Sequence, residues 1–363
     1  MKTTLGDIFE IGSGGTPSKT KSEYYGGDIP WVKTGDLKEE YLYSVEDFIT
    51  EAGLRNSSAK MYEPGTVLIA MYGATIGATS ILKFNACTNQ ACAAFKPCKD
   101  VLPEYLYYFL RSKKQKFISD GVGGAQPNIS AGYLKKVIFD VIPLNNQERV
   151  ITVLDKVNRI INERQQELDE LDNLIKARFV EMFGENGRVV PLTDYVWFQE
   201  GPGVRSVDFT DKGTILLTGS NINDNEISFG YKSDRFISDE LASGKYAHFI
   251  CDKGDILVVS SAIAPEKFDR KVTIVQEDKK YCLNTGIIRF KPNKEYMTLG
   301  YFREFLKTDY FKHQVMAEMR GIAQMHFGPS HLKQMTILLP ESMEQQIEFE
   351  QFVKQVDKSK VVA

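Results

Sequence analysis

A glycine-rich stretch near the start of the chain has residue types that could bind a phosphate. It reads GSGGTPSKTKSEYYGGDIPWVKTGDL from Gly12 to Leu37. A P-loop requires a glycine directly before its lysine, but Ser18 precedes Lys19, and Pro17 lacks the backbone N–H that such a loop would use. A dinucleotide-binding fingerprint requires its third glycine where Pro17 stands. The stretch therefore matches neither nucleotide-binding pattern, and these residues alone favour a flexible loop.

Cysteine and histidine positions give no metal-binding or catalytic pattern. The five cysteines are odd in number and contain no Cys-x-x-Cys pair, and the four histidines all lie in the second half of the chain. His326 and His331 could share a metal with a third ligand, but surface histidines are the favoured interpretation. We expect no metal, no catalytic residue and no cofactor in this chain.

Length and composition indicate a globular protein with more than one domain. A chain of 363 residues can form two or three domains. The net charge of -3 lacks the basic excess typical of a nucleic-acid-binding protein, although a whole-chain sum can hide a basic face. There is no apolar run of about 18 residues and no signal-like N-terminal block. We therefore expect a cytoplasmic protein without a membrane partner.

Three segments in the first half recur in the same order in the second half. CTNQACAAFKP (87–97) parallels CLNTGIIRFKP (282–292), YLYYFLRS (105–112) parallels YFREFLKT (301–308), and GGAQPNISAGYLKK (123–136) parallels GIAQMHFGPSHLKQ (321–334). Upstream, Phe9, Gly12 and Gly14 are matched with Phe198, Gly201 and Gly203, and VKTGDL (32–37) with LLTGSN (216–221). A repeat of this kind predicts two similar modules, each rich in short strands and ending in one or two helices.

Between the modules, apolar residues recur at helical steps of three and four, with Arg164 at the one polar position. The residues of this seam are Val150, Leu154, Val157, Ile161, Leu168, Leu171 and Ile175. The pattern predicts a helix of roughly 40 residues, about 60 Å long, that must pack on another helix. A second apolar stripe, with Phe349, Val353 and Val356, predicts a C-terminal partner helix of about half that length. Either the chain is truncated after this short helix, or another protein or a second copy of the chain covers the seam around Leu168 to Ile175. In the second case we expect dimers when the chain is isolated.

This arrangement, together with several motifs, resembles the specificity subunits of type I restriction-modification systems over the whole chain. The motifs are GGTPSKTKSEYYGGDIPWVKTGDL (14–37), GTVLIAMYGATIGATS (65–80), GVGGAQPNIS (121–130) and LNNQERVI (144–151). The resemblance implies an α+β fold of two target recognition domains, separated by long helices that form an antiparallel coiled coil. It divides the chain into recognition domain 1 (1–143), a central helix (144–186), recognition domain 2 (187–339) and a C-terminal helix (340–363).

The same resemblance implies a DNA-recognition subunit without catalysis of its own. Each domain would read one half of an asymmetric bipartite site in double-stranded DNA. Two methyltransferase subunits would dock on the helices, with restriction subunits joining them, and S-adenosylmethionine, ATP and Mg would be bound by those partners. The chain has neither the Asn/Asp-Pro-Pro-aromatic motif of amino-methyltransferases nor a Walker A sequence, which agrees with this role. The alternatives are a protein-binding scaffold of duplicated modules, and a methyltransferase or nuclease with an unrecognised site.

Polar and basic residues in the predicted loops are the candidates for DNA contact, because loop side chains can reach base edges and phosphates. In the first module they are Ser18, Lys19, Lys21, Lys33, Thr34, Tyr72, Thr75, Gln126 and Asn128. In the second module they are Arg205, Ser206, Ser220, Asn221, Ser260, Ser261, Arg270, Lys271, Arg320, Gln324 and His326. Gln126 and Gln324 occur in both modules, which favours a backbone or phosphate role, since residues that read different half-sites should differ.

Overall fold

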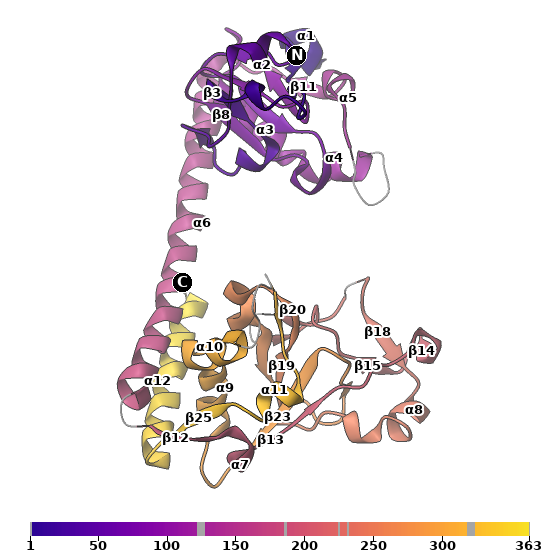
Figure 1. The fold of residues 1–363 in the computed structure, drawn as a ribbon, viewed down its shortest axis with the longest axis vertical. Coiled ribbons are helices and arrows are strands. Elements are labelled where there is room, and N and C mark those ends of the chain that lie inside the picture. The colour runs from indigo at the N-terminus through magenta and orange to yellow at the C-terminus, as the bar shows by residue number, and fades with distance from the viewer. Residues whose placement is uncertain are drawn as a thin grey trace. The chain divides into compact units, whose positions relative to one another are not determined.

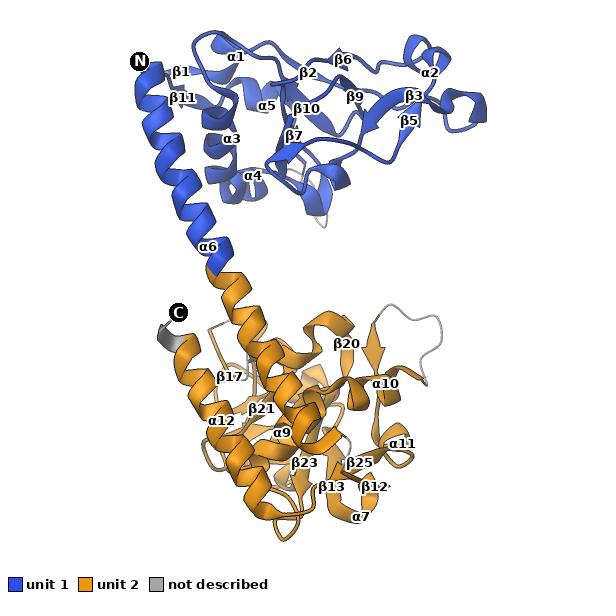
Figure 2. Cartoon of the chain, turned by 90° about the vertical axis from the view of Figure 1, so that its left-hand side faces the viewer, with its two compact units in different colours: residues 1–163 blue, residues 164–363 orange. Residues whose placement is uncertain are grey.

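The chain forms two compact units that both combine strands and helices. The computed structural model describes residues 2–121, 128–184, 187–223, 226–230, 232–317 and 324–362 (Figure 1). The units are residues 1–163 and 164–363 (Figure 2). Their mixed content confirms the predicted α+β class. The division falls inside the long helix α6 (Leu144–Phe179), so the predicted central helix contributes its first part to unit 1 and the rest to unit 2.

Unit 1 is built on a five-stranded sheet with the order β2-β10-β7-β8-β4, a four-stranded sheet with the order β5-β3-β9-β6, and the pair β1-β11. The strands are β1 (Lys2–Thr4), β2 (Ile11–Ser13), β3 (Tyr25–Val32), β4 (Tyr41–Leu42), β5 (Phe48–Ile49), β6 (Met61–Tyr62), β7 (Val67–Ala70), β8 (Thr79–Leu82), β9 (Ala86–Thr88), β10 (Cys92–Phe95) and β11 (Ile138–Asp140). The helices before α6 are α1 (Leu5–Ile8), α2 (Glu51–Arg55), α3 (Pro103–Ser112), α4 (Lys114–Asp120) and α5 (Ala131–Lys135).

Unit 2 has two four-stranded sheets, β13-β23-β19-β21 and β14-β18-β15-β22, and the pairs β12-β25, β16-β17 and β20-β24. The strands are β12 (Arg188–Pro191), β13 (Val196–Glu200), β14 (Phe209–Thr210), β15 (Thr214–Leu216), β16 (Ile222–Asn223), β17 (Glu226–Ile227), β18 (Arg235–Ile237), β19 (Ile256–Val259), β20 (Ser261–Ile263), β21 (Val272–Ile274), β22 (Tyr281–Cys282), β23 (Ile287–Pro292), β24 (Met325–His326) and β25 (Thr336–Leu339). The helices are α7 (Leu192–Tyr195), α8 (Asp239–Ser243), the 3-10 helix η7 (Pro265–Lys271), α9 (Leu299–Lys307), α10 (Asp309–Ala317), α11 (Pro329–Leu332) and α12 (Met343–Val362).

The predicted duplication is present in the strand register. In unit 1, Phe95 of β10 lies opposite Val67 of β7 and Ile11 of β2. In unit 2, Phe290 of β23 occupies the same place, opposite Ile256 of β19 and Phe198 of β13. Both phenylalanines are fully buried. The repeated Phe-Lys-Pro segments are therefore the central strands of equivalent sheets.

The register corrects the upstream match made from the sequence. Ile11, not Phe9, is the equivalent of Phe198, so Gly14 is the equivalent of Gly201 rather than of Gly203. A Cβ atom on Gly14 would overlap the carbonyl oxygen of Thr88, and one on Gly201 would overlap the carbonyl oxygen of Asn284. These two glycines recur because each allows a close backbone approach.

A buried glutamine joins each module to the helix that follows it. Gln147 of α6 accepts the N–H of Leu102 at 2.9 Å and donates to the carbonyl oxygens of Asp100 and Ile142. Gln346 of α12 makes the same type of contact, accepting the N–H of Thr298 at 2.8 Å. Both glutamines are fully buried. The similarity of NNQER (145–149) and MEQQIE (343–348) in the sequence could have indicated this pair of glutamines, which were not among the predicted functional residues.

In unit 2 the C-terminal part of α6 runs antiparallel to α12. Lys360 pairs with Asp172 at 2.7 Å, and Arg178 pairs with Glu348 at 3.1 Å. Among the seam residues, four are buried in this core and two are half-buried. The buried ones are Ile175, Phe349, Val353 and Val356, and the half-buried ones are Leu168 and Leu171. The pairing predicted between the central helix and the C-terminal helix is therefore present over this part of α6.

The uncovered part of the seam differs from the prediction. Val150, Val157 and Ile161 are exposed and Leu154 is half-buried, whereas the stretch from Leu168 to Ile175 is covered. The reason lies in the pairing of β12 with β25, which makes α12 begin near the point where α6 ends. An antiparallel helix that starts there can only follow the C-terminal part of α6.

Candidate nucleic-acid interface

Two loops with exposed polar side chains have the same backbone frame in both units. In unit 1, Tyr72 forms an antiparallel bridge with Asn128, and the N–H of Ile129 donates to the carbonyl oxygen of Met71 at 3.0 Å. In unit 2, Ser261 pairs with His326, and the N–H of Phe327 donates to the carbonyl oxygen of Ser260 at 2.9 Å. We call these the paired loops, defined by Tyr72 with Asn128 and by Ser261 with His326.

The residue after the first member of each pair has a left-handed backbone. Gly73 has a φ of 65° and Ala262 a φ of 58°. Alanine rarely adopts this conformation, which costs about 1–2 kcal/mol for an L-residue. The frame is therefore kept in unit 2 even where the local residue disfavours it.

A shallow depression lies beside the paired loop of unit 1. It is lined by Tyr72, Asp120, Asn128, Ile129, Ser130 and Tyr133. The hydroxyl of Tyr133 donates to Asp120 at 2.7 Å, and Lys116 forms an ion pair with the same carboxylate at 3.0 Å. These two contacts lower the pKa of Asp120, the Tyr133 hydrogen bond most strongly. The depression therefore has fixed hydrogen-bonding groups and one compensated negative charge.

The tip of the glycine-rich loop presents exposed polar and basic side chains. Ser18, Lys19 and Lys21 are all exposed. The hydroxyl of Tyr25 donates to the carbonyl oxygen of Pro17 at 2.6 Å, which fixes the loop, and Lys21 donates to the hydroxyl of Tyr24 at 3.0 Å, which raises the pKa of Lys21. An ordered tip with two ammonium groups suits contact with phosphates.

Two residues that the sequence predicted to contact DNA are buried inside unit 2, so neither is available for that contact. Asn221 is fully buried, and its side chain accepts the N–H of Thr218 at 2.9 Å and donates to Asp234 at 2.8 Å. The strand pairings shift the sequence match of 32–37 with 216–221 by one residue, so Asn221 corresponds to Asp36 and not to Leu37. Asp36 accepts the N–H of Lys33 in the equivalent turn at 2.7 Å. Ser260 is also fully buried.

Lys271 was also predicted to contact DNA, but its side chain is directed into unit 2. Its ammonium group donates to the carbonyl oxygens of Gly219 and Ile222 and to Oδ1 of Asn223, at 3.0, 2.7 and 2.6 Å. This lysine ties η7 to the β16 region, so its charge is directed at backbone rather than at solvent. Its neighbour Arg270 lies in a groove of unit 2 between α6, α9 and α12.

The other candidates keep positions from which contact is feasible. Arg205, Ser206, Ser220 and Gln324 are exposed, and Lys33, Thr34 and Thr75 are half-buried. Lys33 also forms an ion pair with Asp47, and this hydrogen bond raises its pKa. Gln126 and Arg320 lie outside the described residues.

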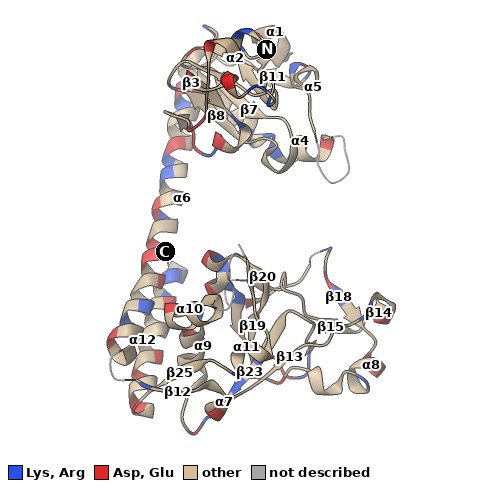
Figure 3. Cartoon of the chain, viewed as in Figure 1, with Lys and Arg blue, Asp and Glu red and all other residues tan. Residues whose placement is uncertain are grey.

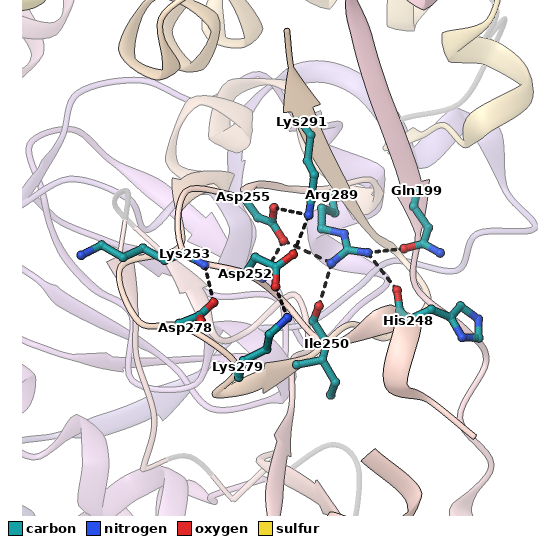
Figure 4. Close-up of polar contacts among 10 residues, drawn as sticks. All are labelled: Gln199, His248, Ile250, Asp252, Lys253, Asp255, Asp278, Lys279, Arg289 and Lys291. Carbon is teal, nitrogen blue, oxygen red and sulfur yellow. Dashed lines mark hydrogen bonds and ion pairs between the residues drawn. The ribbon is translucent and has the colours of Figure 1, made fainter. Parts of the chain in front are cut away.

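Unit 2 contains a buried charge cluster that sequence reasoning did not find. Arg289 of β23 pairs with Asp255 at 3.2 Å, and both side chains are at most 5% exposed. Figure 4 shows the guanidinium group also directed at the carbonyl oxygens of Ile250 and His248 and at Gln199, at 2.7, 2.9 and 2.6 Å. This cluster holds the segment before β19 against the central sheet. A charged residue in a predicted strand is normally expected to be exposed, so the sequence did not indicate that Arg289 and Asp255 are buried together.

Over the described ranges, no group of three or more His, Cys, Asp or Glu side chains could hold a metal ion. Burial raises the pKa of Cys87, Cys92 and Cys282 to about 12. In the same ranges, no helix combines the length and apolarity that crossing a membrane requires.

Figure 3 shows acidic and basic residues interleaved along α6.

Comparison with known proteins identifies the family. Residues 1–172 and 186–361 each match the family described as type I restriction modification DNA specificity domain. The chain is 32% identical over 182 residues to the MjaIX specificity subunit of Methanocaldococcus jannaschii, covering 49% of this chain and 42% of that protein. It is 30% identical over 165 residues to the EcoR124I/EcoR124II specificity subunit of Escherichia coli, covering 44% of this chain and 41% of that protein.

Each of these matches spans less than half the length of the relative. A solved chain from work on complex assembly and conformational transition of the type I R-M system covers 100% of this chain and 91% of its own length, with a TM-score of 0.56 and 15% identity, which supports the fold. Because the family match covers most of the chain in two copies, the protein belongs to the type I restriction-modification DNA specificity family.

Proposed function

We propose that this chain is the DNA-recognition subunit of a type I restriction-modification complex and reads an asymmetric bipartite site. The observation that carries the proposal is the equivalence of the paired loops. Their backbone hydrogen bonds match, while their side chains are the exposed Tyr72 and Asn128 in unit 1 and the half-buried Ser261 and exposed His326 in unit 2. Equal frames with unequal side chains are what two readers of different half-sites require.

In this proposal the chain has no catalytic role. It directs methyltransferase and restriction subunits to the site, and those subunits bind S-adenosylmethionine, ATP and Mg. The complex would act on chromosomal or invading DNA in the cytoplasm. The relatives are named as specificity subunits of restriction enzymes, which supports this division of labour.

The exposed part of the α6 seam supports a docking role. Val150, Val157 and Ile161 are 38%, 46% and 58% exposed on one helix. Apolar side chains grouped in this way mark a protein-binding surface. We propose that methyltransferase subunits bind there in the complex and that a second copy of the chain covers the stripe when the chain is isolated. A sedimentation mass that stays monomeric at all concentrations would contradict the second statement.

Exchange of residues 1–143 for a recognition domain from a relative tests the main proposal. The chain is co-produced with its methyltransferase partner, and the methylated sequences are determined across the genome. One half of the recognised sequence should change and the other half should persist. Changes in both halves, or in neither, would reject a bipartite reader. Methylation or cleavage by the purified chain alone would instead favour the enzyme alternative, and absence of DNA binding with the partner present would favour a protein scaffold.

A further inference from the structure

We infer that Tyr72 with Asn128, and Ser261 with His326, are equivalent base-discriminating pairs that set the preferred base pair at one position of each half-site. The inference rests on the proposed function and adds the residues that decide specificity. The first support is position. The members of each pair come from segments far apart in sequence, joined by backbone hydrogen bonds that are nearly equal in length in the two units.

The second support is the contrast between these pairs and the other repeated positions. Asn89 and Asn284 are identical in the two units and lie in equivalent turns, where their carbonyl oxygens accept the N–H groups of Cys92 and Ile287. The paired loops instead differ at both members. A scaffold position gains nothing from such differences, whereas side chains that read different bases must differ.

The third support is chemistry combined with exposure. Asn128 and His326 are exposed, and Tyr72 is 41% exposed. Amide, imidazole and hydroxyl groups can bond to base edges, and an asparagine amide can bond twice to adenine. The Nδ1 atom of His326 lies 2.9 Å from the hydroxyl oxygen of Ser261, so one member of the pair orients the other. An oriented ring discriminates between bases better than a freely rotating one.

The fourth support is the left-handed backbone beside both pairs. Ala262 has a φ of 58° where its equivalent Gly73 has 65°. Unfavourable backbone conformations cluster at functional sites, where the surrounding structure maintains them. Here the backbone hydrogen bond between Phe327 and Ser260 maintains the geometry, and the result is a fixed direction for Ser261.

The other candidates fit different roles. Lys19 and Lys21 are cations at a loop tip and suit phosphates, which carry no sequence information. Asn221, Ser260 and Lys271 are directed into the protein. Both paired loops therefore combine an equivalent backbone frame with accessible side chains that differ between the units.

The test transplants the pair of unit 2 into unit 1 in the full chain. The double variant Tyr72→Ser/Asn128→His is co-produced with the methyltransferase partner, and its methylated sequences are compared with those of the unchanged chain. We expect the unit 1 half-site to change at one or two adjacent base pairs, with the other half and the spacing unchanged. The preference for the original base pair should fall about tenfold or more. The matched control Tyr43→Ser removes another exposed tyrosine of unit 1 and should leave the sequence unchanged.

A second readout keeps the test decisive if the double variant gives no methylation. The complex is then bound to a duplex DNA library randomised over the unit 1 half-site, and Asn128→His alone is tested in the same way. An altered or relaxed preference at one position supports the inference. An unchanged preference in a variant that melts like the unchanged chain overturns it. If the unchanged chain selects no bipartite sequence at all, the proposed function fails rather than this assignment.

Discussion

The two units have the same strand frame, but two neighbouring interior positions hold charged side chains in unit 2 and small uncharged ones in unit 1. In unit 2 these positions hold the buried pair of Asp255 and Arg289. The strand registers place Thr66 and Ala94 at the equivalent positions of unit 1, where both are fully buried. A duplicated backbone can thus be stabilised either by small side chains or by an ion pair that ties in a neighbouring segment. Buried ion pairs are poor sources of net stability but severe liabilities when one partner is lost.

The largest effect should come from breaking this pair. Arg289→Met should lower the free energy of unfolding of unit 2 by up to about 3–5 kcal/mol, because the buried Asp255 carboxylate would lose its buried cation. It would keep only the Lys291 ammonium group at 3.3 Å and the N–H of Asp252 at 2.8 Å. Denaturant unfolding followed by tryptophan fluorescence can measure it, since Trp197 lies against the guanidinium group at 5.2 Å.

The double variant Asp255→Thr/Arg289→Met sharpens the comparison. It gives unit 2 the threonine of unit 1 and removes the buried carboxylate that lost the guanidinium group, so it should recover most of the lost stability. If the double variant is as unstable as Arg289→Met, the hydrogen bonds of Arg289 to Ile250 and His248, rather than its charge pairing, are what the unit requires.

A second contrast concerns the equivalent tyrosines of α9 and α3. Tyr301 is fully buried, stacks on Phe179 with ring centres 5.3 Å apart, and donates to the carbonyl oxygen of Leu338. Tyr105 is only half-buried. Tyr301→Ala should therefore destabilise its unit by about 3–5 kcal/mol, and Tyr105→Ala by about 1–2 kcal/mol. Equal losses of stability in thermal or denaturant unfolding would contradict this difference. They would mean that the packing of Tyr301 on Phe179 of α6 does not stabilise unit 2.

Several of these features could be predicted from the sequence, and others could not. The repeated Phe-Lys-Pro segments lie in buried central strands, so the duplication followed from residue patterns, whereas the α+β class was implied by the family resemblance. The match of Gly12 with Gly201 was wrong because isolated glycines carry little register information along short strands. Asn221 was misread because an amide in a turn looks the same whether it faces solvent or caps the backbone. The sequence also could not show which part of the seam α12 covers, because that depends on the pairing of β12 with β25.

A smaller effect should distinguish the two paired loops. Ala262→Gly relieves the left-handed conformation in unit 2 and should raise the free energy of unfolding by about 0.5–1 kcal/mol. Gly73→Ala introduces the same strain in unit 1 and should lower it by about 1 kcal/mol. Thermal unfolding of both variants checks the signs. A destabilising Ala262→Gly would show that the alanine methyl group packs better than its backbone conformation suggests.

The smallest effect is an acid dependence in unit 2. Hydrogen bonds from Lys279 and Lys291 lower the pKa of Asp252 to about 2. A carboxyl group whose folded pKa is depressed stabilises the fold fully above its unfolded value near 3.8, and this contribution is lost as the pH falls toward 2. The side chain is 35% exposed, so solvent screening limits the contribution to at most about 1 kcal/mol. Asp252→Asn should therefore lower stability at neutral pH and flatten its decline between about pH 4 and pH 2. Lys291→Met removes one of the two donors to Asp252, so its loss of stability with falling pH should be intermediate between those of the unchanged chain and Asp252→Asn. If Asp252→Asn loses stability over this pH range as the unchanged chain does, other carboxyl groups control the acid response of this unit.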